Sequence, residues 1–245
     1  MVPAKGYRIF GLALGALLLG VGIPAAHASI IYVNSDAGPD EYNVENGGPQ
    51  IPDVLISVTP AWAPNGMGYE WVSYAQTGCN TFVALTGICT PGVANPPAST
   101  GNITLSDGPP STPTATFFNT FFLPSGYTYS GTLSVWADDT ARVILGGNLL
   151  IDANPVQGGN CAITEIGCLP TTVGVFNIGA DLTAGENNTL ELDAYQFLGG
   201  SPFGVMYTAT ITGTLDSPTP EPASYVLMGL GLVAIGILIP RARRA

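Results

Sequence analysis

One stretch decides the fold class of this chain: residues 204–214 read GVMYTATITGT. Apolar side chains alternate with the others, so Val205, Tyr207, Ala209 and Ile211 share one side and Met206, Thr208, Thr210 and Thr212 share the other. A strict period of two is typical of a β-strand that buries one face against a core. The stretch therefore predicts a half-buried strand.

The same period recurs through residues 29–215. In 189–195, leucine and alanine at 190, 192 and 194 alternate with Glu191, Asp193 and Tyr195. Between 141–145 and 149–152, the residues Gly146-Gly147-Asn148 predict a hairpin turn, because glycine and asparagine tolerate positive φ. Further strands are expected at 30–33, 54–58, 69–74, 81–85, 114–122, 132–136 and 173–178. Many short strands between Gly-, Pro- and Asn-rich loops predict an all-β protein, a β-sandwich of one domain.

The N-terminus has the order of a secretory signal peptide. Lys5 and Arg8 precede an uncharged apolar run over 9–23, and Ala26-His27-Ala28 supplies small residues at the positions that signal peptidase cuts, just before Ser29. A retained membrane helix is the alternative, but glycines and a proline interrupt the run, and spanning needs about 20 apolar residues. We expect a signal helix over 1–28 that is removed during export.

The C-terminus predicts a membrane segment. A proline-rich stalk over 216–222 leads into the apolar residues 223–239, which are followed at once by Arg241, Arg243 and Arg244. Such a segment is just long enough for a transmembrane helix, and flanking arginines stay on the cytoplasmic side. The domain at 29–215 is therefore expected to face outward.

The tail also resembles a known family. Pro220-Glu221-Pro222, the apolar segment and the terminal arginines resemble, over residues 219–245, the PEP-CTERM sorting signal. This resemblance implies recognition by an exosortase in a Gram-negative bacterium, transient membrane anchoring, and delivery to the cell surface or extracellular matrix. A permanent single-span anchor on a stalk is the alternative.

Charge restricts the partners of the exported part. Residues 29–217 hold 16 of the 17 acidic residues and one of the six basic ones, Arg142, which leaves a net charge of −15. Such a field repels nucleic acid and favours neutral or cationic partners. The single histidine, His27, leaves with the signal peptide.

Four cysteines lie in the exported part, where disulfides persist. Their spacing favours two local bridges, Cys79 with Cys89 and Cys161 with Cys168, among the three pairings that four cysteines allow. A zinc site is the alternative, but no Cys-x-x-Cys pair or neighbouring histidine supports it.

Two further segments resemble sugar-binding sandwiches. The run LSVWADD over 133–139, with the hairpin after it, is similar to PA14-type domains, and LTAGENNTL over 182–190 is similar to a passage of galactose-binding-like jelly rolls. These resemblances imply a jelly-roll-like sandwich that binds carbohydrate, in some members through calcium.

Asp138 and Asp139 are the candidate metal ligands. Adjacent carboxylates supply the oxygen atoms that calcium prefers, and the alternative is that they form a turn before the next strand. Trp62, Trp71 and Trp136 are candidates for a sugar-stacking platform or for the core.

Catalytic signals are few, because the mature chain lacks histidine and lysine and has no Gly-x-Ser-x-Gly elbow. The sequence thus predicts an exported, non-catalytic surface protein, with polysaccharide as a candidate ligand and no cofactor other than the candidate calcium. The alternative is a secreted glycoside hydrolase that uses two carboxylates.

Overall fold

The computed structural model describes residues 28–45, 47–74, 112–154, 161–196, 202–216 and 228–232, and the backbone of 79–83 and 88–91. The chain divides into a unit over Ala28–Asp216 and a second unit made of Met1–His27 and Ser217–Ala245. In the second unit the described residues 228–232 are helical. The signal helix lies outside the described residues.

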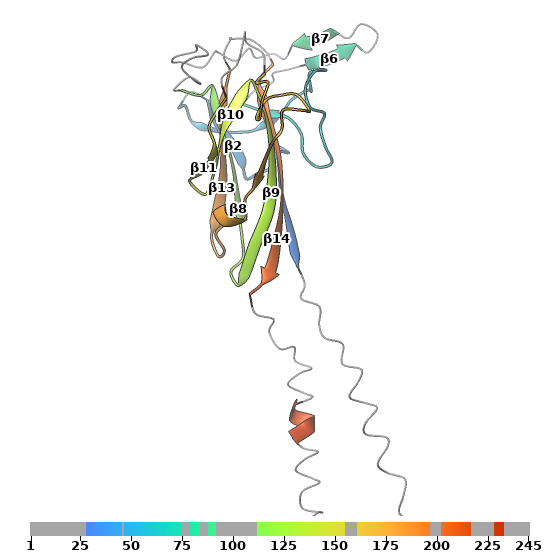
Figure 1. The fold of residues 1–245 in the computed structure, drawn as a ribbon. Helices are drawn as coiled ribbons and strands as arrows, with labels where there is room; N and C mark the ends of the chain where they lie inside the picture. Colours follow the sequence, from blue (N-terminus) through green and yellow to red (C-terminus); the bar gives the residue numbers. More distant parts are fainter. Residues whose placement is uncertain are drawn as a thin grey trace, which may run out of the picture. The chain divides into compact units, whose positions relative to one another are not determined.

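The unit Ala28–Asp216 is built on two antiparallel sheets and a separate pair of strands (Figure 1). The first sheet has the order β12 (Gly174–Asn177), β9 (Tyr127–Asp138), β14 (Gly204–Leu215), β5 (Val72–Ser73) and β4 (Val54–Leu55), with β1 (Ser29–Asn34) also paired to β14. The second has the order β11 (Asn148–Ile151), β10 (Thr140–Leu145), β13 (Asn187–Tyr195), β8 (Ala115–Phe122), β2 (Glu41–Glu45) and β3 (Gln50–Pro52). The separate pair is β6 (Cys79–Val83) and β7 (Ile88–Pro91).

The main core lies between the two sheets. The alternation predicted for 204–214 is confirmed, because Val205, Tyr207 and Ile211 are buried in this core and Thr210 is exposed on the outer face. The second sheet contributes Leu190, Leu192 and other inward residues of β13, β8 and β10. Removing such side chains from water is the main force that holds the two sheets together.

The predicted hairpin is also confirmed. β10 pairs with β11, and Gly146 and Gly147 adopt φ angles of 57° and 82° in the turn between them. Positive φ at both central positions gives the turn a twist that matches the flanking strands.

A second apolar cluster covers part of the outer face of the first sheet. Trp62, Trp71, Met206 and Cys168 are buried in it, and Trp136 packs against it. Two long segments form the cover, since the backbone N–H of Ala63 donates to the carbonyl oxygen of Cys168 at 2.7 Å.

The strand predictions for 54–58 and 69–74 were too long. The structure forms only the two-residue strands β4 and β5 there, because the chain between them leaves the sheet to build this cover. The strands β2, β3 and β7 were not predicted. Most of the Pro- and Ser-rich stretch over 90–113 lies outside the described residues.

Among the described residues, no helix has the length and apolar character needed to cross a membrane. The transmembrane helix over 223–239 therefore stays a prediction.

Candidate functional site

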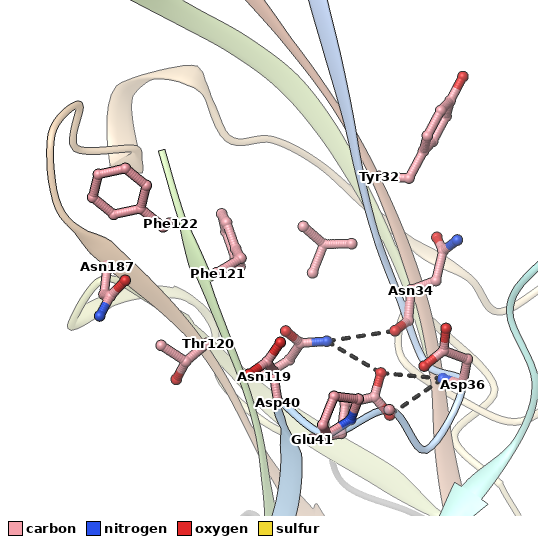
Figure 2. Close-up of a pocket in the computed structure, with 13 residues that line it drawn as sticks. Tyr32, Asn34, Asp36, Asp40, Glu41, Asn119, Thr120, Phe121, Phe122 and Asn187 are labelled. Atoms are coloured by element: carbon pink, nitrogen blue, oxygen red, sulfur yellow. Dashed lines mark hydrogen bonds between the residues drawn. The ribbon is translucent and has the colours of Figure 1, made fainter. Parts of the chain in front are cut away.

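A groove of about 530 Å³ opens between β1 and the end of β8 (Figure 2). Its origin is a change in the width of the second sheet. β2 begins at Glu41, which lies opposite Asn119 of β8, so residues 120–122 continue beyond the reach of β2. The chain before Glu41 crosses instead to β1, and the space between the two sheets stays open at that point.

Aromatic side chains stand at both walls of the groove. Tyr32 on β1 is 66% exposed and Phe122 on β8 is 57% exposed, although large apolar side chains usually turn inward. Polar side chains line the groove between them: Asn34, Asp36, Asp40, Asn119, Thr120 and Asn187. Aromatic rings supply apolar contact area, while amides and carboxylates accept and donate hydrogen bonds. This combination fits a ligand with both C–H faces and hydroxyl groups.

Glu41 fixes the shape of the groove rather than offering a free carboxylate. Its Oε2 accepts hydrogen bonds from the backbone N–H groups of Asp36 (3.2 Å) and Ala37 (2.8 Å), and its Oε1 accepts one from Nδ2 of Asn119 (3.2 Å). Glu41 is 3% exposed, and burial raises its pKa to about 7 despite these hydrogen bonds. The carboxyl group thus holds the loop 36–40 against β8.

A buried polar cluster lies beneath Glu41. Asn119 donates from Nδ2 to the hydroxyl oxygen of Tyr207 at 3.0 Å, and Asn43 donates from Nδ2 to Oδ1 of Asp53 at 2.7 Å. Burial raises the pKa of Asp53 to about 7, and the Asn43 hydrogen bond opposes that rise. Oδ2 of Asp53 and Oδ1 of Asn43 have no hydrogen-bond partner among the described residues. A proton on Asp53 therefore stabilises the folded state.

The two candidate calcium ligands are buried where the chain passes from β9 to β10. Asp138 is 5% exposed and Asp139 is 1% exposed. Burial and the neighbouring Asp139 carboxyl raise the pKa of Asp138 well above its usual range. The structure thus brings the two carboxyl groups together, in an environment that favours a protonated Asp138. Calcium binding here stays a prediction.

A disulfide covers Asp138. Cys161 and Cys168 are bonded to each other, which is one of the two predicted bridges. Sγ of Cys161 lies 3.0 Å from Oδ1 of Asp138, and because a disulfide sulfur carries no proton, this is a contact and not a hydrogen bond. Asp138 and the two cysteines have ligand atoms within 4.8 Å of one another, but the bonded sulfurs are not the thiolates that a metal requires. The side chains of Cys79 and Cys89 lie outside the described residues, so their bridge stays a prediction.

The tryptophans belong mainly to the core. Trp62 and Trp71 are 5% and 0% exposed, and their rings pack with centroids 4.2 Å apart. The indole Nε1 of Trp71 donates to the carbonyl oxygen of Ala63 at 2.8 Å. Trp136 stacks on Tyr69, with ring planes 9° apart. A sugar-stacking platform of these three residues is therefore not formed, because two of them are covered.

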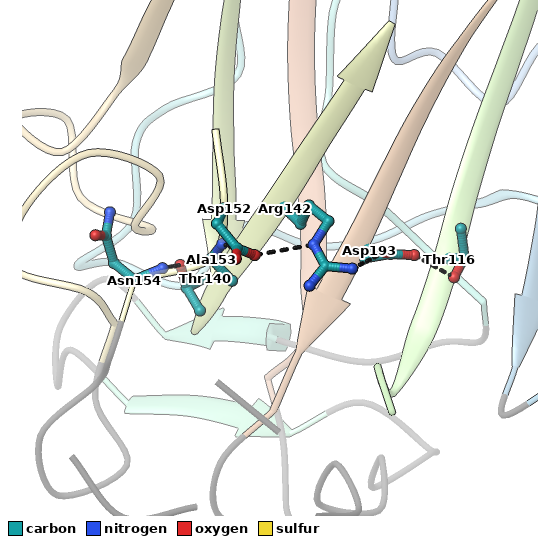
Figure 3. A network of polar contacts seen from close by, with 7 residues as sticks. All are labelled: Thr116, Thr140, Arg142, Asp152, Ala153, Asn154 and Asp193. Atoms are coloured by element: carbon teal, nitrogen blue, oxygen red, sulfur yellow. Dashed lines mark hydrogen bonds and ion pairs between the residues drawn. The ribbon is translucent and has the colours of Figure 1, made fainter. Parts of the chain in front are cut away.

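Arg142 is held in an ion-pair network (Figure 3). Its Nε donates to Oδ1 of Asp152 at 2.9 Å, and Nη1 lies 3.5 Å from Oδ2 of Asp193. Thr116 donates to the other oxygen of Asp193 at 2.7 Å. The single basic side chain of the exported part thus ties β10 to its neighbours, and an anionic ligand finds no unpaired cation there.

Sequence reasoning missed the groove. Tyr32 and Phe122 occur in predicted strands, but the alternation alone does not show which outward side chains share one opening. The useful signal was the acidic segment 36–40, which contains Asp36 and Asp40 and comes directly after the apolar strand β1.

Residues 218–244 match the model of the PEP-CTERM protein-sorting motif. The chain carries this sorting motif at its C-terminus. The motif indicates export and membrane-anchored surface display in a Gram-negative bacterium, with exosortase-dependent processing. The predicted sorting residues Pro220, Glu221, Pro222, Arg241, Arg243 and Arg244 all fall within it.

No curated protein matches the chain. Among solved structures, the chain is similar to a family 35 carbohydrate binding module from Clostridium thermocellum, with 14% identity, a TM-score of 0.32, and coverage of 73% of this chain and 97% of that one. It is also similar to a putative β-galactosidase from Bacteroides fragilis, with 13% identity, a TM-score of 0.30, and coverage of 74% and 23%. A β-D-glucuronidase from Dictyoglomus thermophilum gives 16% identity, a TM-score of 0.26, and coverage of 53% and 25%. At these TM-scores the ligand has to be sought in the chain's own residues.

Proposed function

We propose that this PEP-CTERM protein is a non-catalytic surface or matrix protein that binds carbohydrate in the groove between β1 and β8. The observation that supports this most is the pair of exposed aromatic rings, Tyr32 and Phe122, on either side of a row of amides and carboxylates. Pyranose rings present C–H groups on their faces and hydroxyls at their edges, and both match this lining. The net charge of −15 favours a neutral glycan over an anionic one.

A glycan array with the exported protein tests the proposal. Neutral glycans are expected to bind. Tyr32→Ala and Phe122→Ala are each expected to lower the affinity for the tightest-binding glycan about tenfold, since loss of an aromatic contact costs on the order of 1 kcal/mol or more. Leu149→Ala is the matched control, because Leu149 on β11 is 58% exposed and does not line the groove. Unchanged binding by both aromatic variants would rule out the groove as the binding site.

The hydrolase alternative has one favourable observation, the pKa of about 7 at Glu41, which is a value that suits a general acid. Against it, Glu41 is 3% exposed although it lines the groove, and both of its carboxylate oxygens already accept hydrogen bonds, from Asp36, Ala37 and Asn119. Assays for new reducing ends on the glycans that bind are expected to detect no hydrolysis. Release of reducing ends that Glu41→Gln abolishes would establish the enzyme instead.

Processing of the tail has its own test. Mass spectrometry of the protein from its native host is expected to find a C-terminus near residues 218–223. Recovery of an intact Arg244 from the surface protein would instead indicate a permanent anchor.

A further inference from the structure

The open part of the first sheet's outer face is a surface without charge. Strands β1, β14, β9 and β12 lie in adjacent positions there, and the register places their outward residues in rows. One row contains Tyr32, Thr210, Thr132 and Asn177. The rows on either side contain Asn34, Thr208, Ser134 and Val175, and Ile30, Thr212 and Ser130. We call these eleven residues the hydroxyl face.

Its composition is unusual for this protein. No member of the hydroxyl face is charged, although residues 29–217 carry a net charge of −15. Six members are serine or threonine, and Thr132, Thr210 and Ser130 are exposed. The face also exposes large apolar side chains: Tyr32 is 66%, Ile30 is 56% and Val175 is 59% exposed. An uncharged patch with protruding apolar side chains typically marks an interaction surface.

Geometry restricts the partner to an extended one. Outward residues on neighbouring strands are about 4.8 Å apart and successive outward residues of one strand about 6.7 Å apart, so the hydroxyls form a regular two-dimensional array. A surface hollow of about 590 Å³ runs over this array and is lined by Ser130, Thr132, Val175, Asn177, Thr210 and Thr212, among others. Figure 1 shows the long strands β9 and β14, which carry this array, side by side.

We propose that the hydroxyl face docks a flat, neutral, insoluble polysaccharide. The absence of charge on the face supports a neutral partner. Docking onto this face requires no charged side chain to be desolvated, and desolvation of an unpaired charge would cost far more free energy than desolvation of a hydroxyl group that is hydrogen-bonded in the complex. The hydroxyl array pairs with sugar hydroxyls, and the exposed Tyr32 and Val175 contact pyranose C–H faces. This surface lies beside the groove and shares Tyr32 and Asn34 with it. It goes beyond the proposed function by adding a second contact of different shape.

The test is depletion of the exported protein onto microcrystalline cellulose and chitin, with alginate beads as the anionic comparison. The wild type is expected to bind at least one neutral solid, to avoid alginate, and to bind equally at low and at molar salt, because no charge on the face is screened. Thr132→Lys and Thr210→Lys are expected to reduce binding about tenfold, since each leaves a charge to desolvate. Thr183→Lys, on the exposed loop before β13, is the matched control and is expected to bind like the wild type.

Two further variants separate this surface from the groove. Phe122→Ala is expected to weaken the binding of soluble glycans in the groove and to leave depletion onto the solids unchanged. Thr210→Val, which keeps the shape and removes one hydroxyl, is expected to reduce depletion while the melting temperature stays unchanged, so misfolding is not the cause. Three results would each overturn the proposal. The wild type could fail to bind both neutral solids, Thr132→Lys and Thr210→Lys could bind the solids as well as the wild type does, or the wild type could form a dimer that these variants dissociate.

Discussion

The two ends of β9 and β14 carry very different outer faces. At one end, Trp136 and Met206 lie under the segments that carry Trp62 and Cys168, and the outer face has become a second core. At the other end, Thr132 and Thr210 lie opposite each other and are exposed. Both ends have the same period of two in the sequence. Alternation therefore indicates which side chains point away from the main core, whereas the long loops determine which of those side chains are exposed to solvent.

The largest expected contrast is in stability. Trp71→Ala at the covered end is expected to lower the free energy of unfolding by about 3–5 kcal/mol, because it leaves a large cavity in a closed cluster. Thr210→Ala at the open end is expected to change it by no more than about 0.5 kcal/mol, as for most surface substitutions. Urea unfolding of both variants measures the difference. Equal effects would show that the cover is not packed as described.

The buried acids beneath the groove predict a pH dependence of stability. Asp53 has a folded pKa of about 7, above its ordinary value of 3.8, and Glu41 is raised in the same direction. The contribution of these two carboxyl groups to the stability of the folded state is therefore complete below their ordinary pKa values and is lost as pH rises through about 7. Asp53→Asn removes that titration and supplies an N–H group that can donate to Oδ1 of Asn43.

This variant is thus expected to stabilise the protein at pH 8 by on the order of 2–4 kcal/mol, at about 1.4 kcal/mol for each pKa unit, and much less at pH 5. Melting curves at the two pH values measure the effect. Asp152→Asn, at an exposed acid of the Arg142 pair, is the control and should not reproduce it. Loss of stability at both pH values would contradict a protonated Asp53.

The disulfide tests the cover directly. Replacing Cys161 and Cys168 together by alanine is expected to cost about 2.5 kcal/mol, the loop-closure value for a bridge of this span. Because the same loop covers Asp138 and Trp71, the variant should also increase hydrogen exchange at the end of β9. A variant as stable as the wild type would show that the apolar cluster holds the loop without the bridge.

Calcium gives the smallest expected effect. If Asp138 and Asp139 bind the ion, millimolar calcium raises the melting temperature by mass action, and Asp139→Ala abolishes the rise. Asp152→Ala is the matched control at an exposed acid. An unchanged melting curve of the wild type would show that the pair does not bind calcium.

The sequence predicted the sandwich because its signal is local. Period two in 204–214 and the Gly146-Gly147 turn need no information from elsewhere in the chain, and both were confirmed. Whether Trp62 and Trp71 are buried depends on a contact between Ala63 and Cys168, which lie far apart in the sequence. The groove likewise depends on where β2 begins relative to β8, which is a matter of register between strands. The periodicity shows neither contact. It therefore left the core and a sugar-stacking platform as alternatives for the tryptophans, of which the structure shows the core, and it did not reveal the groove.

The open surfaces are proposed to bind glycan, while the covered end of β9 and β14 is structural. Hydrogen–deuterium exchange of the exported protein, with and without a neutral glycan that binds on the array, tests it most directly. We expect bound glycan to slow exchange in 30–34 and 118–122, which form the two walls of the groove, and to leave exchange in 161–172 unchanged. Protection confined to 161–172, with none at β1 or β8, would contradict it.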